Sequence, residues 1–106
     1  MAKIRAITAS GGSSENIAEY LVTSASPLSK TISKNTHAIF VINCRAANWG
    51  SISIAGTSVS PTAFTALGNG YGGYGLSMYE TDLSANDVVT MTPTNVNMSG
   101  AMYIDE

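Results

Sequence analysis

Residues 37–46 read HAIFVINCRA and alternate between two kinds of side chain. Successive side chains of an extended chain point to opposite faces, so this stretch predicts a β-strand. One face is entirely apolar and consists of Ala38, Phe40, Ile42, Cys44 and Ala46. The other face is mixed and consists of His37, Ile39, Val41, Asn43 and Arg45. We expect the apolar face to be core, and the mixed face to lie outside or to be partly covered.

Further strand patterns recur about every ten residues. They cover residues 28–33, 51–59, 62–67, 74–81, 87–92 and 98–106. A turn at residues 34–36 is expected to pair residues 28–33 with residues 37–46. The glycine-rich residues 68–73 are expected to join the strands at residues 62–67 and 74–81. Residues 16–21 suit a helical turn, through an Asn-x-x-Glu capping pattern, or a strand. Their all-β neighbours favour the strand.

The composition agrees with β-structure. Charged residues make up only 11% of the 106-residue chain, whereas 14 Ser and 11 Thr supply uncharged polarity. Residues 46–79 carry no charged side chain, yet glycines and Pro61 interrupt every apolar run before the roughly 20 residues that cross a bilayer. The outer face of this uncharged region is therefore expected to be rich in Ser and Thr or covered by another protein.

Seven or eight short strands without a long helix predict an all-β fold, a single antiparallel β-sandwich with a jelly roll favoured at eight strands. Residues 15–106 would form this domain. Residues 1–14 would be an N-terminal arm with a Gly/Ser joint, SGGSS at residues 10–14, of linker-like composition. Residues 3–8 are then a detachable arm or an edge strand.

Several classes of function are disfavoured. A net charge of −2 with five basic residues gives no electrostatic footprint for nucleic acid. One cysteine makes no internal disulfide, and the N-terminus lacks the apolar run of a secretory signal, so we expect assembly in a cytoplasm. Partners would be protein or glycan, with neither nucleic acid nor membrane involved.

No motif predicts a catalytic, cofactor or metal site, so we expect no enzyme. The GNGYGG stretch at residues 68–73 spells a dinucleotide-binding loop but lacks the helix that must follow, and is interpreted as a turn. His37 has no nucleophile elbow to serve, and Cys44 is expected in the core. Residues 82–87 resemble the start of a calcium loop without its sixth-position glycine, and are interpreted as a solvated turn.

The aromatic residues in loops are the candidate contact residues. Trp49, Tyr71 and Tyr74 lie beside Asn and Gly, where exposed rings stack on sugars or anchor protein interfaces. A third interpretation is that these rings fold back over the open ends of the sandwich. Lys3, Ile4 and Arg5 of the N-terminal arm are further candidates, because an extended arm can add a strand to a neighbour's sheet.

A short segment carries a family resemblance. Residues 79–91, YETDLSANDVVTM, resemble the jelly-roll turn in which Leu-x-x-Gly-Asp precedes a Val-x-Val strand, with Asn86 at the glycine position. Tumour-necrosis-factor-like domains, carbohydrate-binding modules and viral structural proteins share this turn.

The whole chain, with few charges and a jelly-roll-sized strand pattern, resembles small decoration (cement) or head-fibre proteins of tailed-phage capsids. The resemblance implies a non-enzymatic virion protein that forms homodimers or homotrimers and staples capsid protein subunits, with residues 46–79 and the arm as contact surfaces. The alternative is a carbohydrate-binding module or receptor-binding tip that uses the loop aromatics.

Overall fold

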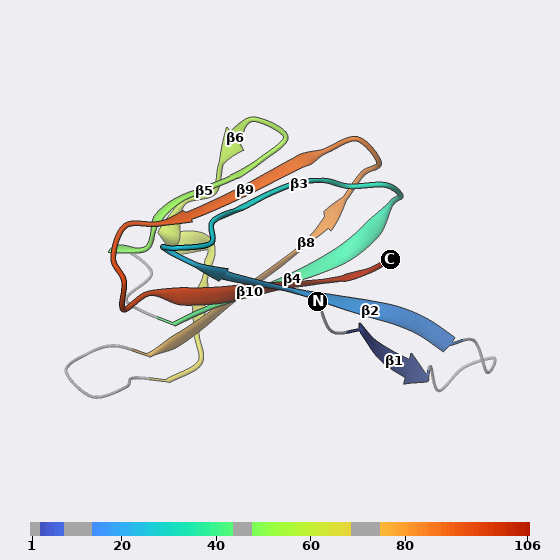
Figure 1. The fold of residues 1–106 in the computed structure, drawn as a ribbon, viewed down its shortest axis with the longest axis horizontal. Helices are drawn as coiled ribbons and strands as arrows, with labels where there is room; N and C mark the ends of the chain where they lie inside the picture. Colours follow the sequence, from blue (N-terminus) through green and yellow to red (C-terminus); the bar gives the residue numbers. More distant parts are fainter. Residues whose placement is uncertain (1–2, 8–13, 44–47, 69–74) are drawn as a thin grey trace.

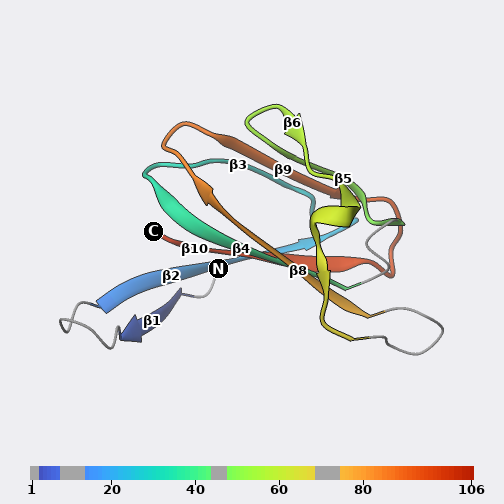
Figure 2. The same cartoon turned by 180° about the vertical axis from the view of Figure 1, so that it is seen from behind.

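The computed structural model describes residues 3–7, 14–43, 48–68 and 75–106, which form two antiparallel sheets packed face to face (Figures 1 and 2). The strands are β1 (Lys3–Ile7), β2 (Ser14–Thr23), β3 (Leu28–Thr31), β4 (Thr36–Asn43), β5 (Gly50–Ile54), β6 (Thr57–Ser58), β7 (Thr65–Ala66), β8 (Leu76–Leu83), β9 (Val88–Pro93) and β10 (Ser99–Asp105). A short 3₁₀ turn, η2 (Pro61–Ala63), precedes β7. Sheet A has the order β1-β2-β10-β4-β8-β7, and sheet B has the order β3-β9-β5-β6.

The topology is that of a jelly roll. The chain runs out through β2, β3, β4 and β5 and returns through β6, β8, β9 and β10. Each outgoing strand pairs antiparallel with a returning one: β2 with β10, β3 with β9, β4 with β8, and β5 with β6. These eight strands confirm the predicted sandwich. The additional strands β1 and β7 lie at the two edges of sheet A.

The core lies between the sheets and contains the face predicted from residues 37–46. Ala38, Phe40 and Ile42 are fully buried there, whereas Cys44 and Ala46 lie outside the described residues. Met91 of β9 and Met102 of β10 complete the centre of the core. Each buried Phe, Ile or Met side chain of this core contributes roughly 1.5–3 kcal/mol of hydrophobic stabilisation.

Three of the sequence expectations were wrong in detail. Residues 28–33 do not form a hairpin with residues 37–46, because β3 pairs with β9 and the chain crosses to sheet A before β4. Residues 51–59 are a hairpin, β5 and β6, rather than one strand. Only Thr65–Ala66 of residues 62–67 is a strand, because Pro61 starts η2 there.

Two turns have backbone that only certain residues adopt easily. Ala55 and Gly56 join β5 to β6 with φ of 52° and 81°, the left-handed pair of a type I′ hairpin turn. Asn86 has φ of 75° before β9, which agrees with its place at the glycine position of the jelly-roll turn.

Residues 16–21 belong to β2, so the strand interpretation is confirmed. β1 is hydrogen-bonded to β2 as an edge strand, with Lys3, Ile4 and Arg5 opposite Ala18, Ile17 and Asn16. Figures 1 and 2 show β1 and the adjoining end of β2 extending past sheet B. Residues 3–7 are therefore an edge strand of sheet A, rather than an arm that is separate from it.

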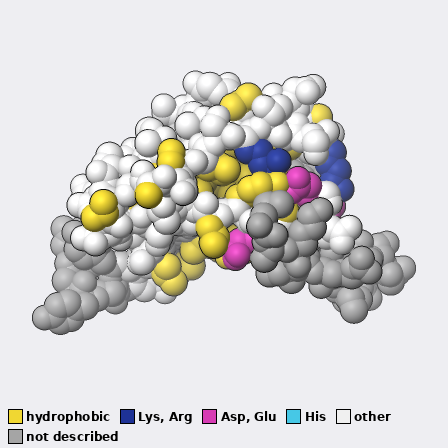
Figure 3. All heavy atoms as spheres, in the orientation of Figure 1, with side chains coloured by type: hydrophobic (Ala, Val, Ile, Leu, Met, Phe, Trp, Pro, Cys, Tyr) yellow, Lys and Arg dark blue, Asp and Glu magenta, His cyan; other side chains and the backbone are white. Residues whose placement is uncertain are grey.

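A cluster of polar side chains connects β2, β3 and the C-terminal residue. Lys30 of β3 lies over the Tyr20 ring, with Nζ 4.7 Å from the ring centroid, and its ammonium is 3.5 Å from a carboxylate oxygen of Glu106. The Tyr20 hydroxyl donates a hydrogen bond to the same carboxylate. Burial, followed by the Glu106 hydrogen bond, raises the pKa of Tyr20. Figure 3 shows dark blue and magenta atoms beside apolar atoms near the middle of this face, whereas the surface above them is mostly white.

Candidate interaction surface

The outer face of sheet B carries almost only hydroxyl groups. The side chains that alternate with buried Ile52, Val89 and Met91 point away from the core. They are Ser29 and Thr31 of β3, Ser51 and Ser53 of β5, and Thr90 and Thr92 of β9, with Val88 as the apolar exception. Ser29 and Ser53 flank Thr90 in register, and Ser51 faces Thr92. For β5, the expectation of an outer face rich in Ser and Thr is confirmed.

The middle of the outer face of sheet A is apolar, whereas the outer face of sheet B is polar. Neighbouring strands place five uncharged side chains in one line across the sheet, which we call the apolar row: Leu21, Ala101, Val41, Met78 and Thr65. Leu21 is 68% exposed, while Ala101 beside it is only 6% exposed because its larger neighbours flank it. No sheet or helix among the described residues covers this row.

Among the residues that the structure describes, charges lie on one side of the apolar row only. The next line across the sheet is Glu19, Tyr103, Ile39 and Glu80, and the line beyond it contains Ile17, Asp105, His37 and Asp82. We call Glu19, Glu80, Asp82 and Asp105 the acidic end of the face. The line on the opposite side of the apolar row, the uncharged end, consists of Thr23, Ser99, Asn43 and Leu76.

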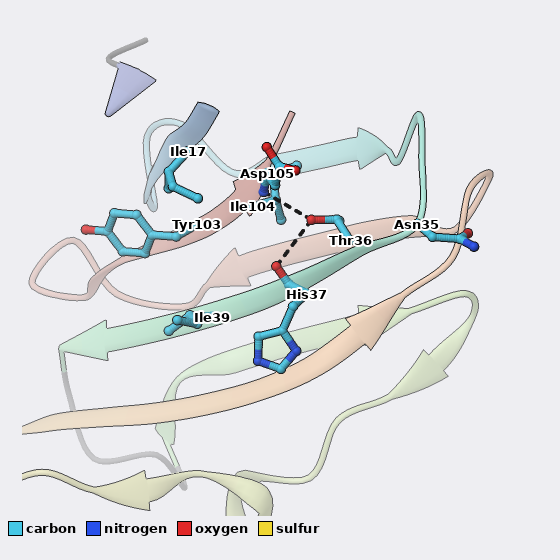
Figure 4. Close-up of a pocket in the computed structure, with 8 residues that line it drawn as sticks. All are labelled: Ile17, Asn35, Thr36, His37, Ile39, Tyr103, Ile104 and Asp105. Carbon is cyan, nitrogen blue, oxygen red and sulfur yellow. Dashed lines mark hydrogen bonds between the residues drawn. The ribbon is translucent and has the colours of Figure 1, made fainter. Parts of the chain in front are cut away.

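Tyr103 stands between two hollows in this face. The hollow toward the acidic end has a volume of about 560 Å³, and Figure 4 shows Ile17 and Ile39 on either side of the Tyr103 ring, with His37 farther along β4. The hollow toward the uncharged end has a volume of about 360 Å³, and Leu21, Val41 and Leu76 contribute to its walls. The Tyr103 hydroxyl donates a 2.8 Å hydrogen bond to Glu19, which fixes the ring on the face. That bond raises the pKa of Tyr103.

His37 is the only histidine and sits among the carboxylates of the acidic end. Its Nδ1 lies 2.8 Å from Asp82 Oδ1, and its Nε2 lies 3.5 Å from Glu80 Oε2. The hydrogen bond to Asp82, and then that to Glu80, raise the pKa of His37 above its usual 6.5. At the other corner of this end, the Lys34 ammonium pairs with Asp105 at 3.1 Å. The acidic end therefore keeps an excess of negative charge, which His37 and Lys34 compensate only in part.

The structure corrects one contact prediction. Trp49 is 2% exposed, so its ring is not a surface platform for a sugar or a partner, and the interpretation in which the ring folds onto the sandwich holds for it. The ring lies against β10 at Gly100, where a Cβ would come within 2.8 Å of Trp49 Cη2. Tyr71 and Tyr74 lie outside the described residues. Lys3, Ile4 and Arg5 take the register positions in β1 given above.

Sequence reasoning missed the exposed large hydrophobic residues of this face, Leu21 and Leu76. A signal was present, since residues 37–46 and 98–106 both carry apolar side chains on the face assigned to the outside. What the sequence did not contain is the strand order, which places β2, β10, β4 and β8 side by side and joins their isolated apolar positions into a row. Of residues 46–79, the region predicted to supply the contacts, Thr65 and Met78 belong to the apolar row.

Other findings point to no particular chemistry. Among the residues that the structure describes, no group of three or more His, Cys, Asp or Glu side chains is placed to hold a metal ion. No helix in those same residues is long and apolar enough to span a bilayer. Comparison with known proteins found no matching family model, no similar curated protein and no similar solved structure.

Proposed function

We propose that this chain is a non-enzymatic structural protein of a virion, a capsid decoration protein that binds copies of itself and capsid subunits. The observation that supports binding is the uncovered apolar row of sheet A, with hollows on either side of Tyr103. Exposed apolar patches bordered by polar residues mark protein interaction sites. The assignment to a virion rests in addition on the resemblance to phage decoration proteins and on the jelly-roll topology.

Contact through this face would draw its energy from burial of apolar surface. Each Å² of apolar surface removed from water contributes roughly 25 cal/mol, and Leu21 and Leu76, 68% and 48% exposed, have much of their surface left to bury. Salt screens charge pairs but not apolar contacts. We therefore expect assemblies formed through the apolar row to survive high salt.

The proposal is tested by co-sedimentation with capsid shells encoded beside the gene for this chain, in 1 M NaCl. Wild-type protein is expected to sediment with the shells. Val41→Lys places a charge in the apolar row and is expected to stay in the supernatant, whereas Thr92→Lys, its matched control on sheet B, binds like wild type. Circular dichroism and thermal melting would verify that both variants are folded. Failure of wild-type protein to bind any such shell contradicts the proposal.

A further inference from the structure

We infer that the occupant of the apolar row is a second copy of this chain, packed face to face across a two-fold axis that runs along the row. This inference rests on the proposed function, because it takes the outer face of sheet A as a protein-binding surface and names its partner. In such a dimer each residue of the row faces itself, and the strands of the two copies run in opposite directions. Three properties of the face support this arrangement.

The first property is the distribution of charge. Rotation by 180° about the apolar row exchanges the two ends of the face, so the acidic end of one copy lies over the uncharged end of the other. Glu19 of one copy then meets Thr23 of the other, and Glu80 meets Leu76, so that no two acidic side chains face one another across these lines. An axis parallel to the strands would instead stack acidic end on acidic end, and like-charge contacts of this kind cost several kcal/mol.

The second property is shape. Tyr103 and Ser99 lie on the same strand, β10, two residues to either side of Ala101 in the apolar row. The proposed rotation therefore brings the Tyr103 ring of one copy over Ser99 of the other. Ser99, Gly100 and Ala101 line the 360 Å³ hollow at the uncharged end. The fixed ring of each copy would fill the hollow of its partner.

The third property is size. The apolar row crosses five strands and β10 is seven residues long. Spacings of about 4.8 Å between strands and about 3.3 Å between residues give a face of roughly 450 Å² in projection. Two copies together would cover about 900 Å² in projection, below the roughly 1,200–2,000 Å² of stable interfaces and in the range of weak, transient ones. We therefore expect a dimer with a dissociation constant in the micromolar range.

The test uses cross-linking by a short bis-maleimide in a Cys44→Ala background, so that each variant has a single thiol. Val41→Cys lies in the apolar row and is expected to give a covalent dimer, because facing sheets pack about 10 Å apart, within the reach of such a linker. Asp82→Cys is the matched control on the same face, because its two copies would lie about 26 Å apart, far beyond that reach. Thr92→Cys on sheet B is the second control. Cross-linking at Asp82 or Thr92 but not at Val41 would overturn the inference.

Sedimentation equilibrium of the unmodified chain supplies a result that does not depend on the folding of any variant. Up to about 100 µM, the expected mass approaches twice the 11.0 kDa of one chain. A monomer throughout this range refutes the dimer. If that monomer still binds shells through the Val41 face, the capsid-binding part of the proposed function stands, and self-association fails together with the partner inference. If the chain dimerises but binds no shell, the partner inference stands and the proposed function fails.

Discussion

The two sheets of the sandwich have similar inner faces and very different outer faces. Both inner faces are apolar and meet in one core. On the outside, sheet B presents Ser and Thr, whose hydroxyl groups water solvates at little cost, whereas sheet A presents Leu21, Val41 and Met78. Low charge alone therefore does not identify a contact surface. The difference lies in whether the uncharged residues are hydroxylic or apolar.

The largest expected effect separates the inner face of sheet A from its outer face. Phe40 is fully buried and its neighbour Val41 points to the opposite side. Phe40→Ala is expected to lower the free energy of unfolding by about 3–5 kcal/mol through loss of burial and creation of a cavity. Val41→Ala should cost less than about 1 kcal/mol in the isolated chain. Urea denaturation at low protein concentration measures both, and equal losses would show that Val41 is a core residue.

The next effect compares the two outer faces. Leu21→Lys puts a charge at an exposed apolar position of the apolar row, and we expect self-association to weaken at least tenfold, about 1.4 kcal/mol. Ser29→Lys on sheet B is the matched control and should leave the association constant unchanged. Sedimentation velocity over a concentration series gives both constants. A stronger effect at Ser29 than at Leu21 would reverse the assignment of the two faces.

A smaller effect concerns the acidic end of sheet A. Because Asp82 and Glu80 stabilise the imidazolium, the pKa of His37 lies above 6.5 in the folded chain. This contribution to stability is fully present below pH 6.5, the ordinary pKa of histidine, and is lost as the pH rises through the raised value. NMR titration of the single imidazole should show the raised pKa, and Asp82→Asn should return it toward 6.5. An unchanged pKa in Asp82→Asn would exclude the 2.8 Å contact as its cause.

The smallest effect is on the sheet B hairpin. Ala55 adopts a left-handed backbone, φ of 52°, in a type I′ turn, where Asn is preferred over Ala. Ala55→Asn is expected to stabilise the fold by about 0.5–1 kcal/mol without affecting association. Thermal melting and the dimer constant would be measured together. A change in association would indicate that this hairpin, and hence sheet B, takes part in the interface.

The sequence predicted the fold better than the surface. Strict alternation in residues 37–46 identified Ala38, Phe40 and Ile42 as core, and the turn at Asn86 indicated a jelly roll, because both signals are local. The pairing of β3 with β9 was not predictable in this way, since it depends on which sheet each strand joins. The apolar row was not predictable for the same reason, because Leu21, Ala101 and Val41 become neighbours only through strand pairing across long sequence separations.

Trp49 is a residue for which the local sequence predicted exposure and the structure shows burial. Its neighbours Asn48 and Gly50 are typical of an exposed loop, yet the ring is buried against Gly100, fifty-one positions along the chain. A large aromatic ring gains more from burial than its local context reveals.

Hydroxyl-radical footprinting with mass spectrometry tests the central claim most directly, because it reports which outer face an assembly covers. Protein at concentrations above the dimer constant, and protein bound to shells, would be compared with dilute monomer. We expect several-fold protection of Met78 and Tyr103 on sheet A, with Val88 on sheet B, 42% exposed, reacting equally in all states. Protection of Val88 with unchanged reactivity at Met78 and Tyr103 would contradict the assignment of sheet A as the contact surface.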